Sequence, residues 1–175
     1  MLKKWILKSK ESVLENPWLG VEKRVYSLPN GKEKEYFHLN RPDYVLIIAV
    51  DIDGKLAVER QYRRGVDNFV YELPAGWIDK GETPEQAAVR EVKEELKYET
   101  KDAVFLGEIY AQPGFSSMKA KVVKVVLESP EQVKSKEEAD EFIEFSFMSK
   151  KEVTDLIKSN TIKDMGCLAA LSLYL

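Results

Sequence analysis

The 175-residue chain has very little of the chemistry on which many active sites depend, because it contains one cysteine and one histidine. Cys167 alone cannot form a disulfide or a multi-cysteine metal site within the chain. His38 alone excludes His-rich zinc sites and most arrangements that pair an imidazole with a Ser or Cys nucleophile. Any catalytic chemistry must therefore come from carboxylates, Lys, Arg, Tyr or Ser.

Long hydrophobic runs are also lacking. The longest wholly apolar stretch covers residues 45–50, far below the ~20 residues of a membrane span. Residues 1–12 lack the apolar core and the cleavage pattern of a signal peptide. The formal net charge of -3 gives no electrostatic reason to expect nucleic-acid binding. These absences predict a cytoplasmic protein that binds neither membranes nor nucleic acid.

The elements that the sequence does indicate alternate between strands and helices, which predicts an α/β layered domain. Residues 18–39 are expected to form a β-hairpin around Pro29-Asn30-Gly31, because Asn-Gly supplies the positive φ angles of a tight turn. Further strands are expected at 43–50, 55–62, 69–73, 103–111, 121–128 and 142–148, and helices at 84–96, 150–159 and 163–175.

The helix expected over residues 84–96 has a well-defined start. Thr83 is its N-cap, Pro84 occupies the first helical position, and Gln86 completes a capping box. An apolar stripe predicts how the helix packs on the core. The stripe consists of Ala88, Val89, Val92 and Leu96.

Three glutamates, Glu91, Glu94 and Glu95, fall beside that stripe within about 100° of arc. Like charges one turn apart destabilise a helix by about 0.2–0.5 kcal/mol, and a divalent cation would convert this repulsion into binding. Oxygen ligands favour Mg²⁺, with Mn²⁺ as the alternative, over zinc. Helix composition alone favours a solvated face on which Glu pairs with Lys and Arg, because such faces are common. Only the wider spacing of the motif points to a metal site instead.

That spacing resembles a known signature. Gly76, then Glu82 after five residues, then Arg90-Glu91-Val92-Lys93-Glu94-Glu95 after seven more is similar to the signature of Nudix hydrolases, which cleave nucleoside diphosphates linked to another group. Six identities at fixed spacing arise by chance at a rate of order 10⁻⁷ per start position. Lys97 stands where the signature has Gly, and Tyr98 where it has an aliphatic residue. Lys97 must therefore either adopt a left-handed conformation, at about 1 kcal/mol, or let the helix continue.

Shorter motifs extend the resemblance over most of the chain and narrow it to the ADP-ribose pyrophosphatase branch. They lie at 61–63, 72–76, 113–114, 140–144 and 162–164. The resemblance implies an α/β/α sandwich with a mixed sheet and an N-terminal β-hairpin region. Residues 1–40 would form that region in a dimer interface, and residues 41–175 the Nudix hydrolase domain. Because the family exchanges the hairpin between subunits, a homodimer is expected.

The resemblance also assigns roles at the metal site. The side chains of Glu91, Glu94 and Glu95, with the main-chain carbonyl of Ala75, would hold Mg²⁺. Arg90 would orient these carboxylates and belongs, with Glu94, to the catalytic set. Gly76 and Glu82 would support the loop, as residues behind metal ligands commonly do.

The catalytic base and the substrate contacts are expected outside the signature. The branch takes its base from the acidic loop, where Glu141 fits first and Glu138 second, although either could equally be a solvated loop residue. Aromatic residues would clamp the adenine, and arginines would contact the diphosphate or ribose. These are Trp18, Tyr36, Arg41 and Arg63. Taken singly, each aromatic fits core packing and each arginine a surface ion pair.

The resemblance implies Mg²⁺-dependent hydrolysis of the diphosphate bond of ADP-ribose, or of a similar nucleoside diphosphate sugar, to AMP and ribose 5-phosphate. The alternative within the class is a diphosphatase for GDP-mannose or another nucleotide sugar. A rival from a different class is a Nudix domain that senses a nucleotide without turnover. The intact Glu91, Glu94 and Glu95 argue against that rival, since a pure binder gains little from crowded carboxylates.

Overall fold

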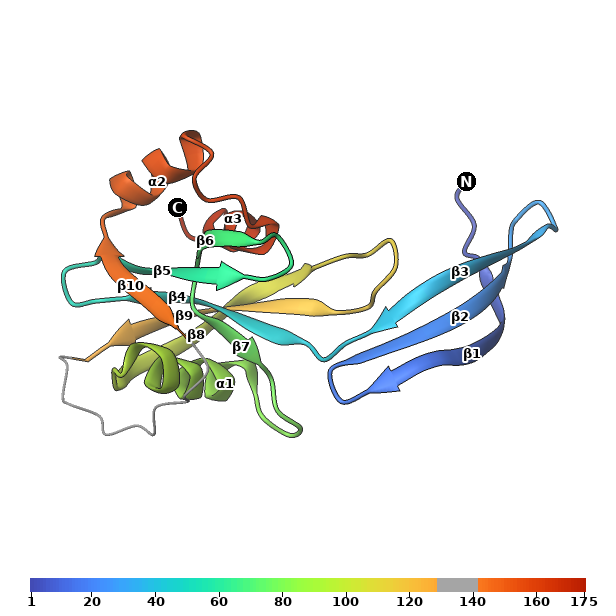
Figure 1. The fold of residues 1–175 in the computed structure, drawn as a ribbon, viewed down its shortest axis with the longest axis horizontal. Coiled ribbons are helices and arrows are strands. Elements are labelled where there is room, and N and C mark those ends of the chain that lie inside the picture. The colour runs from blue at the N-terminus through green and yellow to red at the C-terminus, as the bar shows by residue number, and fades with distance from the viewer. Residues whose placement is uncertain (129–141) are drawn as a thin grey trace. The chain divides into compact units, whose positions relative to one another are not determined.

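The structure, a computed structural model, describes residues 1–128 and 142–175 and divides the chain into two compact units (Figure 1). The N-terminal unit comprises residues 1–43 and 110–119, and the sandwich unit comprises residues 44–109 and 120–175. The second segment of the N-terminal unit therefore comes from within the range expected for the Nudix domain.

The N-terminal unit contains a three-stranded antiparallel sheet, β1 (Ile6–Asn16), β2 (Leu19–Ser27) and β3 (Glu33–Asn40). The predicted hairpin is confirmed, because β2 and β3 pair in one antiparallel register from Gly20–Asn40 to Ser27–Glu33. Its turn closes with a 2.9 Å hydrogen bond from the Gly31 N–H to the Leu28 carbonyl, and Gly31 has a φ of 82°. The expected positive φ at Asn30 is wrong; its side chain instead accepts the Lys32 N–H at 3.1 Å. β1 is a third strand that the sequence pattern did not indicate.

The segment 110–119 ties down the end of β3. Leu39 donates its N–H to the Phe115 carbonyl at 2.8 Å and accepts the Ser116 hydroxyl at 2.9 Å. Four residues later, Asp43 accepts the Lys119 N–H at 2.8 Å. The short stretch between β3 and the sandwich unit is therefore fixed at both ends within the N-terminal unit.

The sandwich unit is built on a seven-stranded mixed sheet with the order β10-β5-β4-β9-β8, to which β6 adds beside β5 and β7 beside β4. β4 runs parallel to β9 and antiparallel to β5 and β7. The strands are β4 (Tyr44–Val50), β5 (Leu56–Arg63), β6 (Asn68–Glu72), β7 (Ala75–Trp77), β8 (Thr100–Tyr110), β9 (Lys119–Leu127) and β10 (Ile143–Met148).

Helices cover both faces of this sheet (Figure 1). One face carries α1 (Pro84–Glu91) and the π-helical turn η1 (Val92–Leu96), and the other carries α2 (Lys150–Lys158) and α3 (Met165–Leu171). The predicted α/β/α sandwich is confirmed. Within residues 1–128 and 142–175, no helix is both long and apolar enough to cross a bilayer.

The central strand β4 separates two hydrophobic cores. Successive side chains of a strand point to opposite faces, and both faces of β4 are buried, which explains its continuous apolar run. Val45, Ile47 and Ala49 pack toward α1 and η1. Leu46 and Ile48 pack toward α2 and α3. The helix with the signature glutamates is therefore seated on a rigid sheet.

Candidate active site

The start of α1 follows the prediction, and its packing departs from it at one residue. Thr83 accepts the Gln86 N–H at 3.2 Å, and the Gln86 side chain accepts the Thr83 N–H at 2.9 Å. The expected stripe is wrong at Val89, which is 37% exposed, whereas Ala87 is fully buried. The face that packs on the sheet consists of Ala87, Ala88, Val92 and Leu96.

The end of the helix is unusual. The turn η1 is π-helical, a wider form that occurs mostly as single turns within α-helices and is frequent at functional sites. It stops at Lys97, whose φ of 62° and ψ of 34° are left-handed, so the first of the two alternatives for Lys97 holds. Tyr98 then packs edge-on against Phe147, with ring centroids 5.6 Å apart, and against Phe145 at 6.4 Å. Aromatic packing thus replaces the aliphatic residue of the signature.

Arg90 is the centre of the site. Its Nη1 donates to a carboxylate oxygen of Glu91 at 2.6 Å and of Glu94 at 3.0 Å. Its Nε and Nη2 each donate to Glu82 at 3.1 Å, and Nη2 also donates to the Trp77 carbonyl at 2.8 Å. One guanidinium thereby joins the loop after β7 to the helix.

This arrangement keeps its members charged. Hydrogen bonding to Glu82, followed by Glu91 and Glu94, raises the pKa of Arg90 further above its ordinary value, although burial opposes the shift. The hydrogen bond from Arg90 lowers the pKa of Glu82 despite partial burial, and the Asp79 N–H, 3.0 Å away, acts in the same direction. Near neutral pH the Arg90–Glu82 pair is therefore fully ionised.

The short strand β7 lies directly beside the glutamates. The Ala75 N–H donates to Glu95 at 3.2 Å. A Cβ atom at Gly76 would lie 1.9 Å from the carboxylate carbon of Glu91 and 1.9 Å from one of its oxygens. Glycine at this position therefore provides the space in which the Glu91 carboxylate lies.

The donor chemistry of these residues fits a divalent ion. Glu91, Glu94 and Glu95 offer only oxygen, which Mg²⁺ and Mn²⁺ prefer, and the peptide of Ala75 lies beside Glu95. In the part of the chain that the structure describes, no three acidic, His or Cys side chains converge into a metal-binding group. Arg90 instead contacts both Glu91 and Glu94. Metal binding therefore requires these carboxylates to rotate away from the guanidinium.

Arg63, a predicted substrate-binding residue, lies near this cluster within the same unit. Its Nε donates to Glu72 at 2.8 Å. Burial acts to lower the pKa of Arg63, but the hydrogen bond and charge of Glu72, together with the charges of Glu95 and Glu59, raise it. The guanidinium is therefore within electrostatic reach of a signature glutamate.

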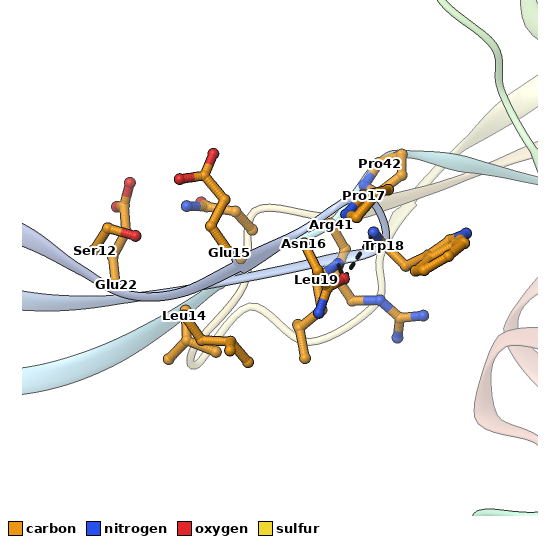
Figure 2. Close-up of a pocket in the computed structure, with 13 residues that line it drawn as sticks. Ser12, Leu14, Glu15, Asn16, Pro17, Trp18, Leu19, Glu22, Arg41 and Pro42 are labelled. Carbon is orange, nitrogen blue, oxygen red and sulfur yellow. Dashed lines mark hydrogen bonds between the residues drawn. The ribbon is translucent and has the colours of Figure 1, made fainter.

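Trp18 and Arg41 line one cavity of about 320 Å³ in the N-terminal unit (Figure 2). The turn between β1 and β2 forms one wall, where the Asn16 side chain accepts the N–H groups of Trp18 at 3.0 Å and Leu19 at 2.9 Å. Trp18 is 68% exposed. Its indole is thus free to stack on a planar ligand.

Tyr36 lies elsewhere on the same sheet. It pairs across the sheet with Arg24, which is five residues beyond the start of β2, or about 17 Å of strand. Its ring packs against Trp5, with centroids 5.5 Å apart, and against Tyr26 at 6.1 Å. Within one chain, Tyr36 and Trp18 therefore do not form a two-ring clamp.

Two partners in the site carried no sequence signal of their own. Trp77 contributes a main-chain carbonyl, which any residue would supply. Glu72 belongs to the 72–76 motif, but nothing in the pattern showed that it pairs with Arg63. The predicted bases Glu141 and Glu138 lie outside the described residues, so their role stays a prediction.

Three features together define a Nudix hydrolase. They are a helix that carries carboxylates, a short strand beside it that contains a glycine, and a mixed sheet between two helical layers. The NUDIX domain profile matches residues 40–167, and the chain belongs to this family. It is 30% identical over 159 residues to the ADP-ribose pyrophosphatase of Bacillus subtilis (strain 168), covering 89% of this chain and 84% of the relative. The fold matches a crystal structure of an ADP compounds hydrolase with a TM-score of 0.86 and 26% identity, covering 99% and 93% of the two chains.

Two further relatives differ in their names. The ADP-ribose pyrophosphatase of Saccharomyces cerevisiae is 34% identical over 143 residues, covering 73% of this chain and 62% of the relative. The methanol dehydrogenase activator of Bacillus methanolicus is 29% identical over 143 residues, covering 82% and 77%. Similar chains therefore carry names for hydrolysis and for activation of another protein.

Proposed function

We propose that this Nudix hydrolase cleaves the diphosphate bond of ADP-ribose or a similar nucleoside diphosphate sugar, giving AMP and ribose 5-phosphate. The observation that carries the proposal is the Arg90 arrangement, which fixes Glu91 and Glu94 beside β7 while Glu95 accepts the Ala75 N–H. The names of relatives that act on ADP-ribose and ADP compounds support the substrate class.

The proposed cofactor is Mg²⁺, with Mn²⁺ as the alternative. Such an ion neutralises diphosphate charge and lowers the pKa of bound water. Glu91, Glu94 and Glu95, with the carbonyl of Ala75, would hold it. Arg90 then keeps its contacts to Glu82 and the Trp77 carbonyl, so it still anchors the helix to the loop when Glu91 and Glu94 turn away.

The remaining roles follow the sequence expectations. Arg63 binds an oxygen of the diphosphate, because a charged guanidinium donates strong hydrogen bonds to phosphate oxygens. Glu141, with Glu138 as second choice, takes the proton of the attacking water. Trp18 stacks on the base with Arg41 beside it in the cavity, a contact type worth about 1–3 kcal/mol per base.

The proposal includes a homodimer in the cytoplasm, whose subunits share elements of the two sites. Tyr36 would then contact substrate only in combination with residues of the second copy, because it lies away from Trp18 in one chain. Light scattering coupled to size exclusion should give twice the chain mass of 20.1 kDa. A mass of one chain under assay conditions would contradict the shared-site arrangement.

Hydrolysis of a substrate panel tests the activity directly. ADP-ribose, ADP-glucose, GDP-mannose, NADH and diadenosine polyphosphates are incubated with Mg²⁺ or EDTA, and products are identified by chromatography. Selective, metal-dependent release of AMP and ribose 5-phosphate is the expected result. Preference for GDP-mannose would support the same diphosphate hydrolysis but would replace ADP-ribose as the proposed substrate. Tight nucleotide binding without turnover would favour the sensor instead.

Variants of the carboxylates test the site. Glu91→Gln and Glu95→Gln should each lower activity by at least about 10–100-fold, since this is the cost of replacing even a residue that only supports a metal ligand. Glu141→Gln should lower kcat by about 100-fold or more while metal binding is retained. Glu108→Gln is a matched control, because Glu108 pairs with Lys121 at 2.6 Å on the other edge of the sheet. Wild-type rates for Glu91→Gln and Glu95→Gln would refute the metal assignment.

A further inference from the structure

The ion pair between Arg63 and Glu72 joins residues that are not neighbours in the sheet. Across β5 and β6, Arg63 is paired with Asn68, whereas Glu72 is paired with Glu59. Arg63 and Glu59 are four residues apart, or about 13 Å of strand. Paired residues share a face, so both side chains must lean along the same face of the sheet to meet.

The pairing engages one side of the guanidinium. Both Nε and Nη2 of Arg63 contact the same oxygen, Oε2 of Glu72. Considering residues 1–128 and 142–175, the guanidinium hydrogen-bonds to no other side chain, which leaves Nη1 without a hydrogen-bond partner there. The Arg63 side chain is 47% exposed, whereas that of Glu72 is 11% exposed. The largely buried Glu72 carboxylate therefore holds one side of the Arg63 guanidinium, and the other side is open to solvent.

The contact with Glu72 determines the direction in which the Arg63 side chain points relative to the signature carboxylates. Glu72 is two residues before Pro74 and three before Ala75, whose N–H contacts Glu95. Glu95 and the 3%-exposed Glu59 both act electrostatically on Arg63. A fold-back toward Glu72 therefore brings the guanidinium toward the signature carboxylates, whereas an unrestrained side chain at the end of β5 would extend into solvent.

We propose that Glu72 is a positioning residue, which holds the Arg63 guanidinium beside the carboxylate cluster with Nη1 open to an oxygen of the substrate diphosphate. This inference rests on the proposed function, because it assigns the diphosphate to Arg63. Prearranging a long side chain removes the cost of ordering it on binding. The effect of Glu72 on affinity should therefore operate entirely through Arg63.

A double-mutant cycle on binding tests this. The affinity for ADP-ribose is measured by calorimetry with Ca²⁺ in place of Mg²⁺, for the wild type, Glu72→Gln, Arg63→Met and the double variant. Glu72→Gln keeps the shape and removes the charge, and it should raise Kd about tenfold. The double variant should bind no more weakly than Arg63→Met alone, since coupled residues are not additive. Glu108→Gln should bind like the wild type.

Further measurements separate positioning from a merely structural role. With turnover, Glu72→Gln should raise KM about tenfold and change kcat less than twofold. If Glu72→Gln does not fold, Glu72→Asp keeps the charge on a shorter side chain and should raise Kd by a smaller factor than Arg63→Met.

Unchanged affinity of a folded Glu72→Gln would overturn the proposal, and so would losses that add in the double variant. A wild type that binds ADP-ribose but hydrolyses nothing would refute the proposed function, while the cycle still decides the role of Glu72. A wild type that binds no ADP-ribose would overturn both.

Discussion

Replacing Gly76 with Ala is the sharpest test of how the site is built. The φ angle of Gly76 lies outside the positive region, so the backbone accepts alanine. The added Cβ, however, would overlap the Glu91 carboxylate at 1.9 Å. Because that carboxylate ends a flexible side chain, we expect Glu91 to rotate away rather than the sheet to open.

The size of the effect follows from what Glu91 loses. Its 2.6 Å contact to Arg90 is a charge-assisted hydrogen bond, of a type worth about 1.5–3 kcal/mol. Hydrogen bonds to water compensate part of this loss of free energy, and Arg90 keeps its contacts to Glu82 and Glu94. The net loss should be about 1 kcal/mol, or about 2–4 °C in Tm for a chain of this size. Activity should fall much further, by at least about 10–100-fold, because a predicted metal ligand is displaced and even the loss of a residue that supports such a ligand costs this much.

The assay combines Tm by calorimetry with kcat for the best substrate of the panel. Gly107→Ala is the matched control, since its Cβ would meet only Leu173 at an ordinary 3.5 Å. Gly107→Ala should retain wild-type activity. A Gly76→Ala variant with wild-type kcat would refute the reasoning, as would a Tm loss above about 10 °C without a specific loss of activity.

Three other perturbations have defined outcomes. Arg90 holds the pKa of Glu82 low, so this carboxylate stabilises the fold above its unfolded pKa near 4.3 and that stability is lost as pH falls through the folded pKa. Glu82→Gln should therefore lower Tm most at pH 7, and the deficit should shrink steadily as the pH falls below about 4; a deficit that does not change with pH would contradict this. Lys97→Gly should raise Tm by about 2–4 °C, since it relieves about 1 kcal/mol of left-handed strain; an unchanged or lower Tm would count against the strain. Burial raises the pKa of the Cys167 thiol, so it should react with a disulfide reagent only on unfolding; rapid native reaction would contradict its burial.

Features set by local chemistry were predictable from the sequence. The capping box at Thr83 depends on residues three apart, and the hairpin turn depends on Asn30-Gly31. The apolar run of β4 reports its burial on both faces. In each case the responsible interactions are either adjacent in the chain or recorded in its hydrophobic pattern.

Features that depend on pairing between distant parts of the chain could not be predicted from the sequence. Every residue of β1 is exposed within one chain, so burial left no alternation from which a strand could be inferred. β7 follows Pro74 and contains a glycine, which indicates a break, yet three residues form a strand because β4 supplies hydrogen-bonding partners. The π-helical turn η1 likewise departs from the regular helix that the 3.6-residue period predicts.

The candidate site likewise has parts that the sequence predicted and parts that depend on distant contacts. The spacing located Glu91, Glu94 and Glu95, because they lie on one continuous helix. It did not show that Arg90 binds the Trp77 carbonyl, which depends on where the loop after β7 lies. The family resemblance also grouped Tyr36 with Trp18, whereas the register of β2 and β3 separates them.

The π-helical turn η1 contains one residue more than an α turn of the same rotation. Deleting one residue from it, such as the exposed Lys93, would therefore let an ordinary α-helix form while the side chains that follow keep roughly their directions. Glu95 would stay beside Ala75, and Leu96 would stay in the core. An inserted residue has no such compensation, because in a regular helix it turns every following side chain by about 100° around the axis. We therefore expect this segment to accept the loss of one residue more readily than the gain of one.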